Sequence, residues 1–130
     1  MNRKRIFKFL SSMLSLCLVV SLFISVSFAA VTSKTLTKYS GDLGNGISLN
    51  ITCTYSTDGS RVLDVSSVSS NITGTTGNYT WKQNSYTVTR LDGGRTAAVK
   101  VTGTLTQYVY VNGQTKTYSS TKTGYAEFCK

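Results

Sequence analysis

Residues 47–55 read ISLNITCTY and alternate strictly between apolar and polar side chains. One face carries Ile47, Leu49, Ile51, Cys53 and Tyr55. The positions between them are Ser, Asn or Thr. An apolar face opposite a polar face, with a period of two residues, predicts a half-buried antiparallel strand. The Gly- and Asp-containing segments on either side, Asp42–Gly46 and Thr57–Ser60, predict turns.

A long hairpin is the second strong element. Residues 96–111 alternate in the same way, Asn112-Gly113 follows, and residues 114–129 return. Asn-Gly supplies the two positive-φ residues of a type I′ turn. A two-residue turn then sets the pairing, which we expect to be Val111 with Gln114, Tyr110 with Thr115 and Tyr108 with Thr117. Tyr108 and Tyr110 fall on the polar face of this hairpin, and Gly103 and Gly124 are expected at bulges or bends.

Four weaker strands complete the pattern. They are expected at Ser33–Tyr39, Val62–Val68, Tyr79–Gln83 and Tyr86–Arg90, with a polar loop over Ser69–Gly77. About seven short strands with turns every 8–12 residues indicate a single all-β domain over residues 30–130. We expect a small antiparallel β-sandwich, Ig-like in general architecture, or a small β-barrel.

The N-terminal segment differs in composition from the rest of the chain. A basic region with Arg3, Lys4, Arg5 and Lys8 precedes an apolar run over residues 9–26, and Ser27-Phe28-Ala29 places small residues at the −3 and −1 positions. This order is typical of a secretory signal peptide, residues 1–29, cleaved near Ala29, and it predicts a secreted, extracellular protein. The alternative is an uncleaved anchor with an outward-facing domain, because Phe9–Val31 is long enough to span a bilayer.

The cysteines and charges of residues 30–130 fit an exported chain. Cys17 lies in the signal segment, so Cys53 and Cys129 remain, and two cysteines in an exported domain predict one disulfide. The ten basic and five acidic residues of this region give a net charge of 10 − 5 = +5. The basic residues are dispersed, which indicates a solvated surface, or attraction to an anionic surface outside the cell.

The chain has no histidine. This excludes a Ser-His-Asp or Cys-His nucleophile pair and a His-ligated zinc site, and no cofactor or metal is expected. A pair of carboxylates could still serve a small hydrolase, for which Asp64 and Glu127 are the only candidates outside turns. The sequons at Asn50, Asn71 and Asn78 matter only in a eukaryotic secretory pathway.

Aromatic side chains give the remaining clue to function. Exposed Tyr and Trp rings offer flat platforms for sugar rings and protein partners. The candidate binding surface is Tyr108 and Tyr110, then Trp81, with Lys100 and Lys116 as nearby charges. The alternative is that Trp81 and several tyrosines fill the core, because Leu and Phe are scarce after residue 30.

These features predict a non-enzymatic binding or interaction domain that acts at the cell surface or in the medium. Its expected partners are carbohydrate, an anionic envelope polymer or another protein. No nucleic-acid partner is expected, and contact with a membrane is expected only through the signal segment if this segment is not cleaved. A secreted antibacterial or membrane-active protein is the alternative, supported by the net charge of +5. A small hydrolase is the third reading.

Overall fold

The computed structural model describes residues 29–130, and the expected signal peptide lies outside these residues except for Ala29. Six strands and one short 3₁₀ helix follow one another along the chain. They are β1 (Thr32–Gly44), β2 (Ile47–Thr57), β3 (Val62–Gly74), β4 (Tyr79–Leu91), η1 (Asp92–Gly94), β5 (Thr96–Val111) and β6 (Gln114–Cys129).

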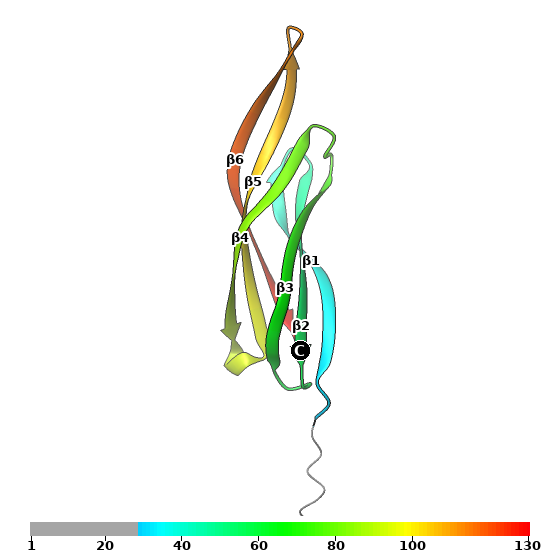
Figure 1. The fold of residues 1–130 in the computed structure, drawn as a ribbon, viewed down its shortest axis with the longest axis vertical. Helices are drawn as coiled ribbons and strands as arrows, with labels where there is room; N and C mark the ends of the chain where they lie inside the picture. Colours follow the sequence, from blue (N-terminus) through cyan, green and yellow to red (C-terminus); the bar gives the residue numbers. More distant parts are fainter. Residues whose placement is uncertain (1–28) are drawn as a thin grey trace, which may run out of the picture.

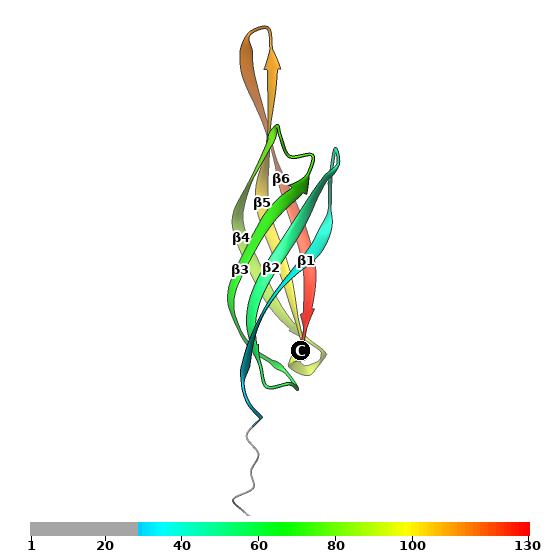
Figure 2. The same ribbon diagram turned by 90° about the vertical axis from the view of Figure 1, so that its right-hand side faces the viewer.

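The strands form two three-stranded antiparallel sheets, ordered β1-β2-β3 and β4-β5-β6. The sheets face each other along the length of an elongated molecule (Figures 1 and 2). They do not join into a barrel. The expected all-β class is therefore confirmed, with six strands in place of about seven. Every ladder joins strands that are consecutive in sequence, so the crossing connections of an Ig-like sandwich are not found in the described part of the chain.

The missing seventh strand has a local cause. The segments expected as Tyr79–Gln83 and Tyr86–Arg90 are one strand, β4, with a bulge between Gln83 and Ser85. Asn84 has no place in the β4–β5 register, and its side chain donates instead to Thr104 Oγ1 of β5 (2.9 Å). A bulge adds one residue to a strand without ending it. In the sequence, the polar residues at the bulge therefore look like a turn between two strands. The expected loop at Ser69–Gly77 is also mostly strand, because β3 pairs with β2 as far as Gly74.

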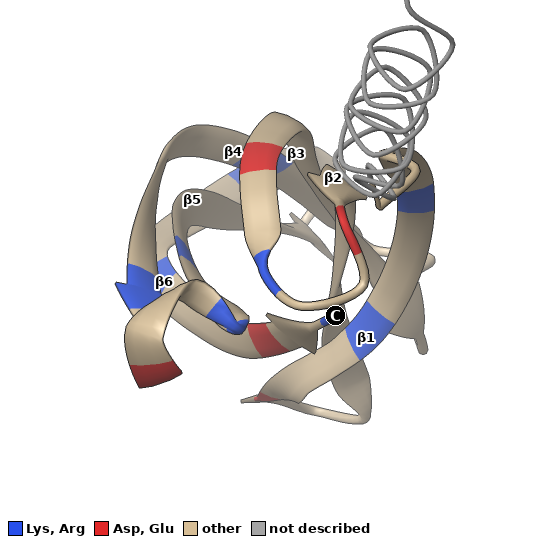
Figure 3. Ribbon diagram, turned by 90° about the horizontal axis from the view of Figure 1, so that it is seen from below, with Lys and Arg blue, Asp and Glu red and all other residues tan. Residues whose placement is uncertain are grey.

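The core lies between the inner faces of the sheets. The strict alternation of β2 is confirmed, since its five odd-numbered apolar residues from Ile47 to Tyr55 are all fully buried. From β5, Ala97, Val99 and Val101 face them, and Phe128 of β6 packs with its ring centroid 6.3 Å from that of Tyr55. Figure 3 looks along the long axis and shows the strands around this interior, with basic and acidic residues spread over several of them.

Side chains hold the sheets together along both seams. Between β3 and β4, the Trp81 indole donates to Ser70 Oγ (2.8 Å) and the Gln83 amide donates to the Val68 carbonyl (3.2 Å). Arg90 donates to carbonyls at the start of β3 in the same way. Between β1 and β6, Lys38 Nζ donates to the Glu127 carbonyl (2.6 Å). Each bond satisfies polar groups that no ladder reaches.

Of the two glycines expected at bulges or bends, Gly103 lies opposite one, because it pairs with Gln83 at the bulge in β4. The β5–β6 register itself runs without interruption through Gly103 and Gly124. A Cβ atom at Gly124 would overlap Ser40 Oγ and Leu49 Cδ2, which belong to the opposite sheet. One at Gly103 would overlap the Trp81 ring. The glycines therefore permit close approach of packed groups, as glycine in a strand often does.

The expected disulfide is not present in the described residues. Cys53 and Cys129 are both free thiols. Cys53 is buried on the inner face of β2, and burial raises its pKa. Cys129 follows the buried Phe128, and successive side chains of a strand point to opposite faces, so its thiol is exposed. The C-terminus is held instead by the Tyr55 hydroxyl, which donates to the Cys129 carbonyl (2.6 Å).

Two turns follow directly from their sequences. Asn112 and Gly113 have φ values of 51° and 77°, and the pairing on either side is the expected one. In the β2–β3 turn, Asp58 accepts hydrogen bonds from the Ser60 hydroxyl and from the backbone N–H groups of Ser60 and Arg61. These bonds, the Ser60 hydroxyl first, lower the pKa of Asp58 to about 2.

Candidate functional site

The β5–β6 hairpin is longer than the sandwich that carries it. Both of its strands have 16 residues, against 11 to 13 in the other four. The pairing of β4 with β5 ends at Tyr79 and Gln107, and after one more backbone hydrogen bond, from Tyr108 N–H to the Asn78 carbonyl (2.8 Å), β5 pairs only with β6. Residues 108–117, named here the projecting hairpin, extend past both sheets (Figures 1 and 2). Neither of its faces is covered by another sheet.

One face of the projecting hairpin carries Tyr108 and Tyr110. They lie opposite Thr117 and Thr115, as the turn register predicts. Tyr108 is 40% exposed and its hydroxyl lies 3.4 Å from Thr80 Oγ1 of β4, whereas Tyr110 is 75% exposed. This face continues the outer surface of the β4-β5-β6 sheet.

The opposite face is a continuation of the inner surface of that sheet. Val109 and Val111 lie on this face and are not buried, whereas Leu105, on the same face of β5 but nearer the sandwich, is buried. On β6 the same face carries Lys116, Tyr118, Ser120 and Lys122, which are spaced by two residues and pair with inner-face positions of β5. Tyr118 is 58% exposed. Cation, ring, hydroxyl and cation therefore follow one another along one side of β6.

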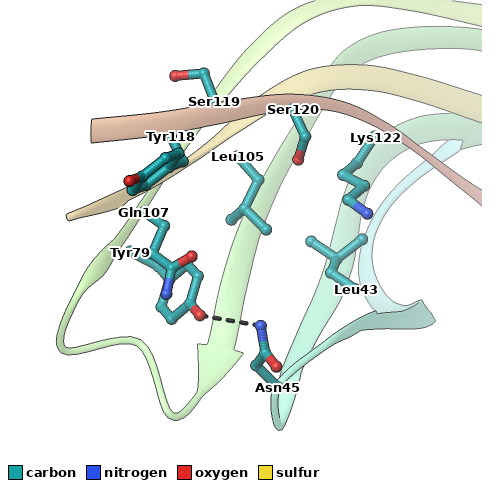
Figure 4. A pocket seen from close by; sticks show the side chains of 9 residues that line it. All are labelled: Leu43, Asn45, Tyr79, Leu105, Gln107, Tyr118, Ser119, Ser120 and Lys122. Atoms are coloured by element: carbon teal, nitrogen blue, oxygen red, sulfur yellow. Dashed lines mark hydrogen bonds between the residues drawn. The ribbon is translucent and has the colours of Figure 1, made fainter. Parts of the chain in front are cut away.

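A hollow of about 150 Å³ opens at the base of this face (Figure 4). It lies between β6, the inner face of β5, the start of β4 and the β1–β2 turn. Its lining residues are Leu43, Asn45, Tyr79, Leu105, Gln107, Tyr118, Ser119, Ser120 and Lys122. Among these nine, one is a cation and none is an anion.

The side chains of the hollow divide into an apolar and a polar set (Figure 4). Leu105 points into its centre, and Leu43 faces it from the β1–β2 turn. Asn45 Nδ2 donates to the Tyr79 hydroxyl (3.0 Å), which joins that turn to β4. Ser119 points away and makes its hydrogen bond to Thr106 on the outer face (3.0 Å).

The structure brings together only part of the candidate surface expected from sequence. Tyr108 and Tyr110 are adjacent on one face, but Lys116 lies on the other, opposite Val109. Trp81 is half-buried in the β3–β4 seam. Lys100 is on the outer face but eight residues from Tyr108, about 26 Å along an extended strand.

Lys100 belongs to a separate polar group. It pairs with Tyr125, whose hydroxyl donates to Glu127 (2.6 Å). This hydrogen bond raises the pKa of Tyr125. Glu127 is exposed on this outer face, while Asp64 is exposed on β3 of the other sheet. Neither carboxylate lines the hollow.

The sequence reading did not identify Tyr118, Gln107 or Lys122 as site residues. A signal for part of this surface was present, because the register set by Asn112-Gly113 places Tyr118 opposite Gln107. No comparable signal exists for Asn45 and Tyr79, which meet through a contact between two distant turns.

Comparison with protein-family models, curated proteins and solved structures found no match to this chain. Within residues 29–130, no helix has the length and hydropathy needed to cross a membrane. The same residues contain no cluster of three or more His, Cys, Asp or Glu side chains suited to a metal ion.

Proposed function

We propose that this protein is an exported, non-enzymatic binding module that contacts a polysaccharide or anionic polymer at the cell surface. The observation that carries the proposal is the projecting hairpin, which displays the exposed tyrosines Tyr108 and Tyr110, with a third exposed tyrosine, Tyr118, at its base. Burying such rings inside the sandwich would have stabilised the fold. Their placement on a projection therefore favours contact with a partner.

A hydrolase has less support. Catalysis by two carboxylates needs them within about 5–10 Å of each other across a substrate cleft. Asp64 and Glu127 belong to different sheets and both are exposed. The hollow has no acidic lining residue. Nor has a second, open groove beside the projecting hairpin, which is lined by Asn78, Gln107, Tyr108, Val109, Tyr110 and Thr115.

Retention on isolated cell envelopes and on insoluble polysaccharides tests the proposal. We expect the wild-type protein to be retained and a Tyr108→Ala/Tyr110→Ala variant to lose much of this retention. Tyr39→Ala is the matched control, because Tyr39 is 63% exposed but lies on β1, away from the hairpin. Absence of retention, or equal retention of all three proteins, would refute the proposal.

The membrane-active alternative is separated by a second measurement. A membrane-disrupting protein releases dye from anionic vesicles, whereas a polymer-binding module does not. Dye release that depends on Tyr108 and Tyr110 would replace the binding proposal with the alternative.

A further inference from the structure

We infer that the hollow and the adjoining face of β6 form a subsite for acidic polysaccharide, with one sugar ring that bears a single negative charge seated beside Tyr118 and Lys122. This inference rests on the proposed function and names its ligand class.

The size of the hollow fits one ring. An enclosed cavity of about 150 Å³ accommodates benzene, and the hollow has this volume. Because the hollow is open on one side, a bulkier sugar ring can seat one face in it while the rest of the ring stays joined to its chain outside. A folded protein partner could not insert more than one side chain here.

The lining suits a sugar in particular. Leu43 and Leu105 offer apolar contact, and the exposed ring of Tyr118 stands at the wall (Figure 4). A sugar ring has an apolar C–H face that packs on such surfaces, while its hydroxyl groups need hydrogen-bond partners. The amide of Gln107 and the hydroxyl of Ser120 supply both donors and acceptors at the same place.

Charge selects an acidic sugar. Lys122 is the one charged residue of the lining, it is half-buried, and it shares the hollow with the apolar side chains of Leu43 and Leu105 (Figure 4). Apolar surroundings strengthen its attraction for an anion relative to a fully solvated lysine. One ammonium group matches a singly charged carboxylate or sulfate, whereas a phosphate monoester carries nearly two charges.

A polymer can continue beyond the hollow. Lys116 lies on the same face of β6, six residues from Lys122, which is about 20 Å along the strand. Tyr118 stands between them, and the facing residues of β5, Gln107, Val109 and Val111, carry no charge. The face therefore presents two separated cations to a ligand with repeated negative charges.

Affinity electrophoresis tests the inference with three soluble polymers: a polyuronate, a sulfated dextran and neutral dextran. We expect the wild-type protein to be retarded by at least one acidic polymer and not by neutral dextran. The polymer that retards it identifies the carboxylate or the sulfate as the recognised group. Lys122→Gln is expected to weaken this binding about tenfold, the usual effect of losing one charge-assisted hydrogen bond.

Three further variants separate recognition from general charge effects. Lys100→Gln makes the same change of net charge on the outer face, and we expect it to bind within about twofold of wild type at one moderate salt concentration. Tyr118→Ser should weaken binding, whereas Tyr118→Phe keeps the ring and should retain it. Lys100, Tyr118 and Lys122 are all at least partly exposed, so these variants should fold.

Equal losses in Lys100→Gln and Lys122→Gln would overturn the inference, as would equal retardation by neutral dextran. Envelope retention without binding to any of the three polymers would overturn it while leaving the proposed function in place. Failure of envelope retention would remove the proposed function itself.

Discussion

Gly124→Ala should destabilise the fold, because Gly124 packs directly against the opposite sheet. The added methyl group would overlap Ser40 Oγ and Leu49 Cδ2 of the opposite sheet. Ser40 Oγ also accepts the Tyr125 backbone N–H (2.7 Å), so it cannot move away without weakening that bond. Insertion of a methyl group into a packed core costs about 1–3 kcal/mol.

Gly77→Ala is the matched control, since a Cβ atom there meets nothing within 4 Å. Any gain from a less flexible unfolded chain is common to both variants. The difference between their free energies of unfolding should therefore be about 1–3 kcal/mol, and Gly124→Ala should melt at least about 4 °C below the control. Leu49→Val, combined with Gly124→Ala, should cost less than the sum of the single changes.

Urea unfolding followed by circular dichroism measures these differences, and an unchanged dependence on urea would show that the unfolded states are comparable. Equal stability of the Gly124→Ala and Gly77→Ala proteins would refute the account of how the sheets pack. Additive effects of Gly124→Ala and Leu49→Val would show that Leu49 is not the group that resists the methyl.

Three other predictions concern hydrogen bonds and thiols. Trp81→Phe removes the indole donor to Ser70 and should lower the free energy of unfolding by about 1 kcal/mol; an unchanged urea midpoint would contradict this. Asp58→Ala should be more destabilising at pH 7 than at pH 2, because a lowered pKa contributes stability above the ordinary carboxyl value and that contribution fades as the pH falls toward about 2; parallel pH–stability curves would exclude it. Of the two thiols, Cys129 should react with an aromatic disulfide reagent in the folded protein and Cys53 only after unfolding, as peptide mapping would show; recovery of a Cys53–Cys129 disulfide would disprove this.

The strands and the hairpin register could be predicted because both depend on neighbouring residues. Alternation located β2, and Asn112-Gly113 set the pairing of β5 with β6. The sequence predicts a break between strands at Asn84 where the structure has a bulge, because a polar residue outside the backbone register is expected in both. The prediction of a Cys53–Cys129 disulfide was wrong for a tertiary reason. The direction of the Cys129 thiol depends on which face of β6 packs against β2, and a local sequence pattern does not contain this information.

The binding surface was less accessible to sequence reasoning. Tyr108 and Tyr110 could be placed on one face from the turn alone. Their separation from Lys100 is the length of eight residues along β5, whereas their separation from Trp81 follows from the seam between the sheets. The hollow needs the β1–β2 turn to reach β4, a contact between Asn45 and Tyr79 that no local pattern contains.

The strand order bears on how quickly the domain acquires its structure. Every ladder joins neighbours in sequence, so each pairing step closes only a short loop and loses little chain entropy. All-β domains usually fold slowly, because their contacts link distant parts of the chain. Here each three-stranded sheet can form by local pairing that starts at its turns. The packing of the two sheets against each other is then the long-range step. We expect folding rates at the fast end of the all-β range.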